Sequence, residues 1–85
     1  MMDDEKKLAF INNSPHRQNT LKALQGTVKT PSNIGTEIGI KTAHVSKILG
    51  DFKKLNLVEC INEEYRKGRI YRLTEDGEEI LKKIK

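Results

Sequence analysis

The stretch that decides the fold runs from Thr30 to Gly77 and reads TPSNIGTEIGIKTAHVSKILGDFKKLNLVECINEEYRKGRIYRLTEDG. Its first half contains two short segments with apolar residues at helical spacing, separated by Gly39 and Ile40. Its second half contains two segments of strand character, joined by a basic loop that includes Gly68. This order predicts a helix, a tight turn, a second helix and a β-hairpin.

The two helices of this stretch have recognisable starts and apolar faces. Thr30 followed by Pro31 is typical of a helix start, with threonine at the N-cap and proline at the first helical position. Gly39 ends this helix, and the next is expected to begin near Lys41 or Thr42 and to run to about residue 55. Apolar residues recur along the second helix at the spacing of one helix face, namely Val45, Ile48, Leu49, Phe52 and Leu55.

Further helices are expected on both sides of this stretch. Ser14-Pro15 repeats the start signal, and the helix that it opens is expected to end at Gly26. A short apolar cluster at residues 8–11 precedes it, and the sequence leaves open whether this cluster is a separate turn of helix or part of the same element. Thr74 is expected to cap a last helix, and residues 27–29 are long enough for only a small edge strand.

The hairpin is expected to pair residues 57–61 with residues 69–73. The connecting loop is long for a tight hairpin and rich in charge, which favours a flexible wing over a structural turn. Tyr71 alternates with Leu73 and is expected to pack inward. Cys60 lies between apolar neighbours on the first strand and is expected to be a small buried residue.

Length predicts the number of domains, and charge indicates the kind of partner. The chain has 85 residues, so a single domain spanning 1–85 is the expectation. Its net charge is +4 and its isoelectric point is about 9.3, which suits a polyanionic partner. The charge is uneven, because residues 41–56 contain four lysines and one aspartate, whereas residues 74–85 contain four acidic and three basic residues. The positive surplus thus lies on the second helix of the pair.

The cellular setting is predicted from the cysteine content and from the lack of membrane-spanning or signal segments in the sequence. Cys60 is the single cysteine, so no disulfide can form within the chain, which fits a reducing compartment. No apolar run approaches the ~18 residues of a membrane span, and no signal peptide opens the chain. We therefore expect a soluble cytoplasmic protein without membrane contacts.

The ordered set of motifs resembles the winged helix-turn-helix of prokaryotic transcriptional regulators, in particular the MarR and ArsR groups and their small archaeal relatives. The resemblance covers about residues 15–80 and rests on TPSNIGTEIGI, TAHVSKIL, LNLVEC and KGRIYRLTEDG. The matching positions are Pro31, Ile34, Gly39, Ile40, Val45, Ser46, Lys47, Leu49, Leu57, Val58, Gly68, Arg69, Tyr71, Leu73, Thr74 and Gly77. The resemblance implies an α+β winged helix-turn-helix with a three-helix core, a β-hairpin wing and a C-terminal helix.

The chain departs from this family pattern in three places. Asn56 stands where a glycine usually precedes the first strand, and asparagine also tolerates the left-handed conformation. The second helix lacks the usual Ser or Thr cap unless Thr42 takes that role instead of Lys41. The long dimerising helices of MarR proteins are absent, so the mode of pairing in that group does not transfer directly.

The second helix of a helix-turn-helix enters the DNA major groove, and its N-terminal residues reach base edges. The candidate base-reading residues are therefore Lys41, Thr42, Ala43, His44, Ser46 and Lys47. Lysine can donate to guanine acceptors, and alanine or a threonine methyl can contact a thymine methyl. The alternative is a charged face that only contacts solvent.

Phosphate contacts are predicted from two other places. Thr30, Ser32 and Asn33 lie at the N-terminus of the first helix of the pair, where free backbone N–H groups and short polar side chains suit a phosphate. Arg66, Lys67 and Arg69 form a cationic wing. The alternatives are ordinary helix capping for the first set and a solvated loop for the second. Arg17 could reach a phosphate from the preceding helix, but an exposed solubilising role is favoured.

Catalytic and metal chemistry are not predicted. The ligands that a metal-sensing protein would need, Cys60, His16 and His44, are scattered in the sequence. No nucleophile with a base, no carboxylate pair and no phosphate-cradling glycine loop is visible. We therefore expect a non-enzymatic protein without a cofactor or metal.

The function expected is a transcriptional regulator that binds double-stranded DNA in a sequence-specific way, with the helix of residues 42–55 in the major groove and the wing of residues 62–69 on the flanking backbone or minor groove. The alternative is a winged-helix module that binds protein in a transcription or RNA-processing assembly. A homodimer is expected, because the small core leaves apolar residues at both ends, namely Leu8, Phe10, Ile11, Ile80, Leu81 and Ile84.

Overall fold

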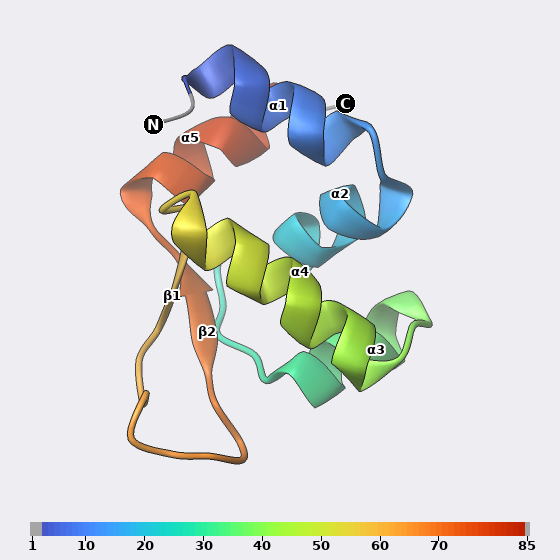
Figure 1. The fold of residues 1–85 in the computed structure, drawn as a ribbon, viewed down its shortest axis with the longest axis vertical. Coiled ribbons are helices and arrows are strands. Elements are labelled where there is room, and N and C mark those ends of the chain that lie inside the picture. Colours follow the sequence, from blue (N-terminus) through green and yellow to red (C-terminus); the bar gives the residue numbers. More distant parts are fainter. Residues whose placement is uncertain (1–2, 85) are drawn as a thin grey trace.

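The computed structural model describes residues 3–84, which form helices around a small antiparallel hairpin (Figure 1). The elements, in order, are α1 (Asp4–Asn12), α2 (Pro15–Ala23), α3 (Pro31–Ile38), α4 (Thr42–Lys54), β1 (Val58–Cys60), β2 (Tyr71–Leu73) and α5 (Glu75–Lys83). The helices α1 and α5 lie together at one end of the molecule, and the loop between β1 and β2 projects from the other. The predicted winged helix-turn-helix is confirmed. No helix in the described range is long and apolar enough to cross a membrane.

Local capping explains why three of the helices begin where the sequence predicted. The hydroxyl of Ser14 accepts a hydrogen bond from the backbone N–H of Arg17 at the start of α2. Thr74 does the same for Gly77 at the start of α5, with a distance of 3.0 Å. At the start of α3, Thr30 accepts from the N–H of the residue three positions on, and proline occupies the first helical position. Each such cap stabilises its helix by about 1 kcal/mol.

The apolar cluster at residues 8–11 belongs to the separate helix α1, which resolves the alternative that the sequence left open. The side chain of Asp3 caps α1 by accepting from the N–H of Lys6 at 2.9 Å. The helix packs against α2 and α5. An ion pair of 3.5 Å between Asp4 and Lys83 also joins α1 to α5.

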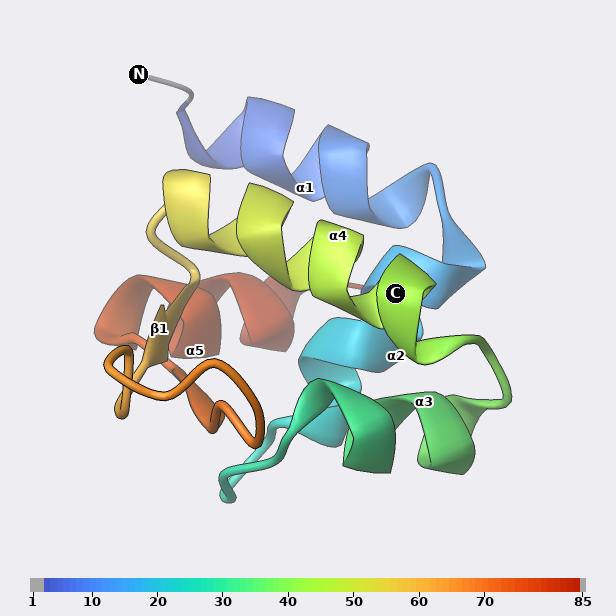
Figure 2. The same ribbon diagram turned by 60° about the horizontal axis from the view of Figure 1, so that its bottom comes forward.

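The turn between α3 and α4 fixes how these two helices meet. Gly39 has a φ of 79°, in the left-handed region that glycine adopts without a steric penalty. The N–H groups of Gly39 and Ile40 both donate to the carbonyl of Gly35, at 2.8 and 3.0 Å. This double closure caps α3 and sends the chain directly into α4 (Figure 2).

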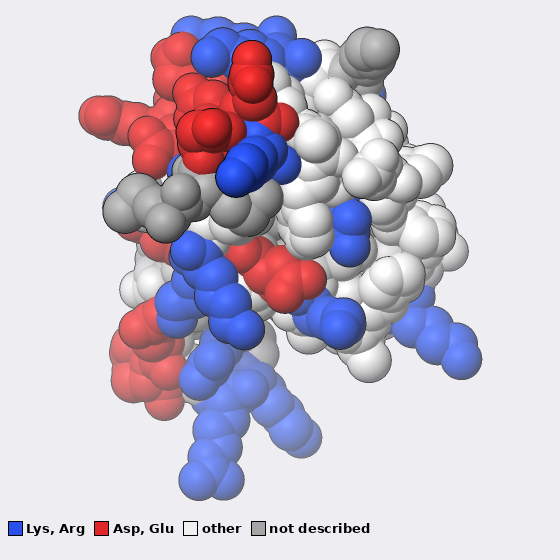
Figure 3. Space-filling view, turned by 45° about the horizontal axis from the view of Figure 1, so that its top comes forward, with Lys and Arg blue, Asp and Glu red and all other residues white. Residues whose placement is uncertain are grey.

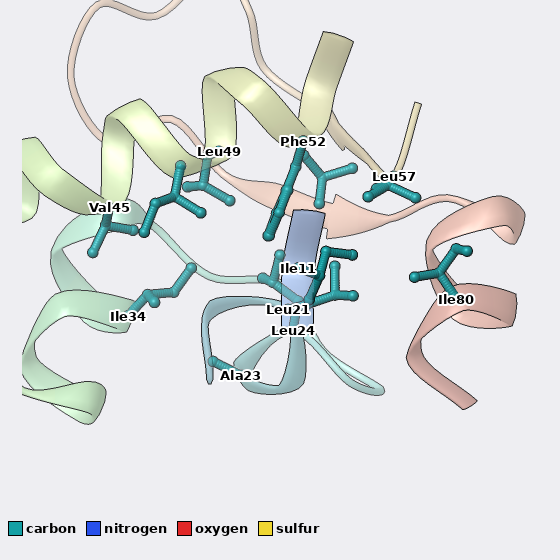
Figure 4. Close-up of a cluster of buried hydrophobic side chains, with 12 residues drawn as sticks. Ile11, Leu21, Ala23, Leu24, Ile34, Val45, Leu49, Phe52, Leu57 and Ile80 are labelled. Atoms are coloured by element: carbon teal, nitrogen blue, oxygen red, sulfur yellow. The ribbon is translucent and has the colours of Figure 1, made fainter. Parts of the chain in front are cut away.

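The core lies where α1, α2, α3, α4 and α5 face one another and the base of the hairpin (Figure 4). The ring of Phe52 is fully buried and extends from α4 towards Leu21, Leu24 and Ile11. The other buried apolar residues are Ala23, Ile34, Val45, Ile48, Leu49, Leu57, Val58 and Ile80. Burying a side chain of this size contributes about 1.5–3 kcal/mol, so this cluster is the main source of the fold's stability.

The hairpin is shorter than the sequence predicted. β1 and β2 pair antiparallel, with Val58 opposite Leu73 and Cys60 opposite Tyr71. One further hydrogen bond, from the N–H of Ile61 to the carbonyl of residue 70, extends the ladder before the loop begins. The predicted edge strand is present as a single bridge, in which Lys29 exchanges both backbone hydrogen bonds with Tyr71. The sheet is therefore small, and its outer part is loop.

Candidate nucleic-acid interface

The exposed face of α4 carries most of the residues proposed to read bases. Thr42, Ala43, His44, Ser46 and Lys47 are all exposed, whereas the stripe formed by Val45, Ile48, Leu49 and Phe52 is buried. This stripe fixes the rotation of α4 about its axis, so the polar residues face solvent as predicted. Lys41 is the N-cap and makes no side-chain capping bond, so Thr42 is not the cap.

The start of α3 uses two of its three polar side chains for capping. Thr30 and Asn33 form a reciprocal capping box, in which the hydroxyl of Thr30 also donates to Oδ1 of Asn33 at 2.8 Å. Ser32 is exposed, and its hydroxyl makes no hydrogen bond within residues 3–84. Of the three residues proposed to hold a phosphate, Ser32 is therefore the one whose side chain is available.

An open groove of about 620 Å³ runs between the start of α3, the exposed side of α4 and the wing. Its lining residues are Thr30, Pro31, Ser32, Thr42, Ser46, Gly50, Lys53, Arg66, Lys67, Gly68, Arg69 and Tyr71. Four of them recur along one stripe of α4, namely Thr42, Ser46, Gly50 and Lys53. Gly50 and Lys53 were not among the predicted site residues, although they lie four and seven residues after Ser46, a spacing that places them on the same helix face.

The wing is a hydrogen-bonded loop, and the flexibility expected from its length and charge stays a prediction. The side chain of Asn62 bridges its base, because Oδ1 accepts from the N–H of Ile70 at 2.7 Å and Nδ2 donates to the carbonyl of Gly68 at 3.1 Å. The N–H of Tyr65 donates to the carbonyl of Asn62 at 3.0 Å. The side chain of Asn62 therefore satisfies polar backbone groups on both sides of the loop. The charge pattern of the sequence does not predict this role.

The three cations predicted in the wing have different surroundings. The guanidinium of Arg69 donates to the carbonyl of Tyr65 at 2.6 Å and to the carbonyl of Glu63 at 3.2 Å. Arg69 therefore holds the shape of the loop and is only half exposed. In contrast, Arg66 and Lys67 are exposed and, within the described residues, have no hydrogen bond or ion pair. They are the wing cations that remain available to a ligand.

An ion pair ties the wing to α4. The ammonium of Lys53 hydrogen-bonds to the carboxylate of Glu63, across the groove wall. This hydrogen bond holds the pKa of Glu63 below its ordinary value of 4.5 and raises the pKa of Lys53 above 10.5. Both side chains are solvent-exposed, so the pair contributes little to stability and acts mainly to orient the wing.

Charges of opposite sign gather at different parts of the surface. In Figure 3 long basic side chains project at the lower end of the view, and a large acidic group lies at the upper left. The first turn of α5 supplies the acidic residues Glu75, Asp76 and Glu78. The cations Lys53, Arg66 and Lys67 line the groove beside α4. Basic side chains therefore line the groove, and one of them, Lys53, is paired with Glu63.

Two expectations about single residues are wrong. Arg17 is not an exposed solubilising residue, because its guanidinium lies 3.8 Å from the centre of the Phe10 ring and donates to the Phe10 carbonyl at 2.9 Å. It joins α2 to α1 instead of facing a ligand. Cys60 is half-buried rather than buried, and its thiol lies 3.5 Å from Oδ1 of Asn62.

His16 and His44, which lie far apart in the sequence, meet in the folded chain. Their ring centres lie 5.2 Å apart, and the rings are nearly perpendicular, at 79°. The two residues lie in the first turns of α2 and α4, and the contact forms because the turn after α3 brings these helix starts together. Among residues 3–84 there is no group of three or more His, Cys, Asp or Glu side chains arranged to hold a metal.

Several solved structures share this fold, and two of them are described as a transcription regulator and a transcriptional repressor. A MarR family transcription regulator aligns over 92% of the chain with a TM-score of 0.72 and 22% identity. A mutant of S. aureus MepR aligns over 94% with a TM-score of 0.74 and 17% identity. The transcriptional repressor BigR from Xylella fastidiosa aligns over 91% with a TM-score of 0.70 and 22% identity. The chain spans 58%, 61% and 76% of these three proteins. At identities this low, the likeness establishes the fold alone.

Comparison of sequences adds little to this. No family model matches the chain. The glutamate–cysteine ligases of Buchnera aphidicola subsp. Acyrthosiphon pisum, strains Tuc7 and 5A, are each 37% identical over 67 residues. That similarity covers 76% of this chain but only 12% of the ligase, so it transfers no enzymatic activity.

Proposed function

We propose that the chain is a transcriptional regulator that binds double-stranded DNA in a sequence-specific way, with α4 in the major groove. The observation that carries this proposal is the groove between α3, α4 and the wing, because it combines exposed hydroxyls with the cations Lys53, Arg66 and Lys67. A polyanion with a regular backbone is the ligand that such a surface fits. The shared fold with bacterial transcription regulators supports the same assignment.

The exposed first two turns of α4 would read the bases. Lys47 can donate to the O6 and N7 acceptors of guanine, and its ammonium has no ion-pair partner in the described chain. The side chains of Thr42 and Ala43 can contact the methyl group of thymine. Thr42 and Ser46 also line the groove, where their hydroxyls can donate to a phosphate at its edge.

The groove would hold one strand of the DNA backbone. At one wall, the hydroxyl and the backbone N–H of Ser32 face anions favourably, whereas the capping box already satisfies the N–H groups of Thr30 and Asn33. At the other wall, Arg66 and Lys67 are available to phosphates. Arg69 would act indirectly, by keeping the wing in shape through its bonds to Tyr65 and Glu63. The capping roles of Thr30 and Asn33 leave them a positioning role in the same wall.

Titration of a labelled duplex at several salt concentrations tests the proposal. Because phosphate contacts release counterions, the logarithm of the affinity should fall linearly with the logarithm of the salt concentration. Phosphate contacts from Arg66 and Lys67 predict a slope of roughly −2 per chain. Absence of duplex binding at low salt would refute the proposal.

The alternative, a winged helix that docks on another protein, finds less support. Residues 42–47 expose no large apolar side chain, because Val45 is fully buried. The large apolar residues that are exposed are Val28, Ile61 and Tyr65, which lie outside this face. An interface between proteins usually centres on aromatic or aliphatic anchors. The exposed face of α4 offers hydrogen-bonding and charged groups instead.

We further propose that two copies pair through α1 and α5 in the cytoplasm, so that two α4 helices meet a palindromic site. Among the apolar residues at the two ends, Ile11 and Ile80 are buried in the chain's own core, so they are not available. The remaining ones are half-buried, namely Leu8, Phe10, Leu81 and Ile84. Pairing with a partner copy would complete their burial, and the symmetry of a dimer matches repeated half-sites.

A further inference from the structure

Two imidazole rings face one another at the start of α4, and no role described above uses this pair. His16 lies in the first turn of α2 and His44 in the first turn of α4. Both residues are exposed, and their ring centres are 5.2 Å apart. Apart from this ring contact, neither side chain has a hydrogen bond or an ion pair in the described chain. Their nitrogens are therefore free to take a ligand.

The separation of the rings suits a shared metal ion. Two imidazoles that bind one tetrahedral ion at ~2.0–2.1 Å from each nitrogen have ring centres about 5 Å apart. The rings now meet edge to face, and rotation about the side-chain bonds is enough to turn one nitrogen of each towards a common point. We propose that His16 and His44 form a binding site for one divalent late transition-metal ion, such as Zn²⁺ or Ni²⁺, with water in the remaining positions.

The ligand set decides which ions can bind. Neutral imidazole is a good ligand for Zn²⁺, Ni²⁺ and Cu²⁺, whereas Mg²⁺ and Ca²⁺ require oxygen ligands. No acidic side chain completes a cluster with the two rings in the described chain, so the site selects nitrogen-binding ions. With two protein ligands, the site is open and exchangeable, and the ion can leave when the metal is scarce.

The charges nearby oppose the ion but do not prevent its binding. Lys41 and Lys47 flank His44 on the same helix, each three residues away, and the helix starts carry partial positive charge. These charges are exposed, and salt screens exposed charges over about 8 Å at physiological ionic strength. Added salt should therefore strengthen metal binding, whereas it weakens the binding of DNA.

The site lies on the face of α4 that the proposed function assigns to DNA. This part of the inference rests on that function. An ion coordinated by His44 occupies space beside Lys47, which lies three residues further along the same helix face, with its water ligands directed away from the protein. A duplex cannot approach the same helix turn without displacing the ion or its water. The metal and the duplex should therefore exclude each other, and the metal would release the protein from DNA.

The metal site is tested directly, without DNA, by titrating ZnCl₂ or NiCl₂ into the full chain and measuring the heat of binding. We expect one ion per chain, and loss of this binding in both His16→Ala and His44→Ala. Cys60→Ser is the matched control, because it removes the single thiol of the sequence and should leave the titration unchanged. Circular dichroism of each variant verifies that it is folded, which is expected because both histidines are exposed.

Titration against pH separates imidazole from carboxylate ligands. Only the neutral ring binds a metal, so an imidazole site should lose the ion at a higher pH than a carboxylate site does. Binding that survives either histidine substitution, or no binding at pH 7.5, would overturn the proposal. If the metal binds but does not displace a bound duplex, the exclusion step is wrong. Failure of duplex binding in the absence of metal would count against the proposed function alone.

Discussion

Gly77 lies against the backbone of Leu57, so close that a Cβ built on Gly77 would be 2.0 Å from the Leu57 carbonyl oxygen. That carbonyl accepts a hydrogen bond from the N–H of Thr74, which caps α5. The hydroxyl of Thr74 in turn donates to the carbonyl of Asn56 at 2.6 Å. The start of α5 is therefore fastened to the chain segment that leaves α4, and the wing is held between the two.

Substituting Gly77 by alanine should destabilise the protein by roughly 1–3 kcal/mol or more, because a methyl group cannot occupy the place of a backbone oxygen without moving α5. Gly50→Ala is the matched control, since a Cβ there has no atom within 4 Å and a helical glycine costs up to ~1 kcal/mol relative to alanine. Urea unfolding of both variants measures the difference. Equal stability of the two variants would contradict the packing described.

Lys47→Ala should weaken binding to the preferred duplex by ~1–3 kcal/mol and should relax its sequence preference, because Lys47 is exposed on the turn of α4 proposed to read bases. Competition titrations with preferred and scrambled duplexes measure both effects. Lys6→Ala in α1 is the control, since it removes the same charge from an exposed site at the other end of the molecule. An equal loss on both duplexes would assign Lys47 to a phosphate instead.

Arg66→Ala and Lys67→Ala should each weaken the binding of all duplexes to a similar extent, because contacts to phosphate carry no sequence information. Each lost contact should also reduce the slope of log affinity against log salt by about one. Fluorescence anisotropy at four salt concentrations provides the slopes. Unchanged affinity and slope in both variants would show that the wing does not contact DNA.

The pKa of Glu63 should return towards 4.5 in Lys53→Ala, because the hydrogen bond from Lys53 is the main cause of its lowered value. A carboxyl group with a lowered pKa adds stability above its ordinary pKa and loses it as the pH falls through the folded value. The ion pair between Lys53 and Glu63 should therefore open only at a pH below the ordinary pKa of 4.5. Carboxyl-carbon NMR titration measures the shift. Lys54→Ala, which removes a neighbouring charge, should leave the Glu63 pKa lowered.

The chain should sediment as a dimer at micromolar concentration, because pairing buries the half-exposed apolar residues of α1 and α5. Leu81→Glu should shift the equilibrium towards the monomer, since it puts a charge into the proposed contact. Val28→Glu is the control, because Val28 is exposed and lies outside α1 and α5. A strict monomer in the unmodified protein would refute the pairing.

The helix starts were predictable because capping is a local property of sequence. Ser14-Pro15, Thr30-Pro31 and Thr74 each place a hydroxyl before a helix, and all three open one in the structure. The left-handed conformation expected at Asn56 is also present, with a φ of 60°. The buried stripe of α4 then fixed which of its residues are exposed, and the candidate base-reading residues followed from the same periodicity.

The features that the sequence did not predict depend on contacts between separate elements. The stacking of Arg17 on Phe10 requires the corner between α1 and α2, and the pairing of His16 with His44 requires the turn at Gly39. No spacing rule links residues so far apart. The bridge that Asn62 makes across the wing depends on a single side-chain orientation, which charge and composition do not encode.

The central claim is that the exposed face of α4 reads a DNA sequence, and selection of bound duplexes from a random pool tests it most directly. The full chain is mixed with the pool, bound duplexes are recovered through several rounds, and the recovered sequences are compared. The account predicts enrichment of one motif, with two inverted half-sites about one helical turn apart if the chain pairs as proposed. Recovery of no duplex at any salt concentration, or of duplexes without a common motif, would contradict it.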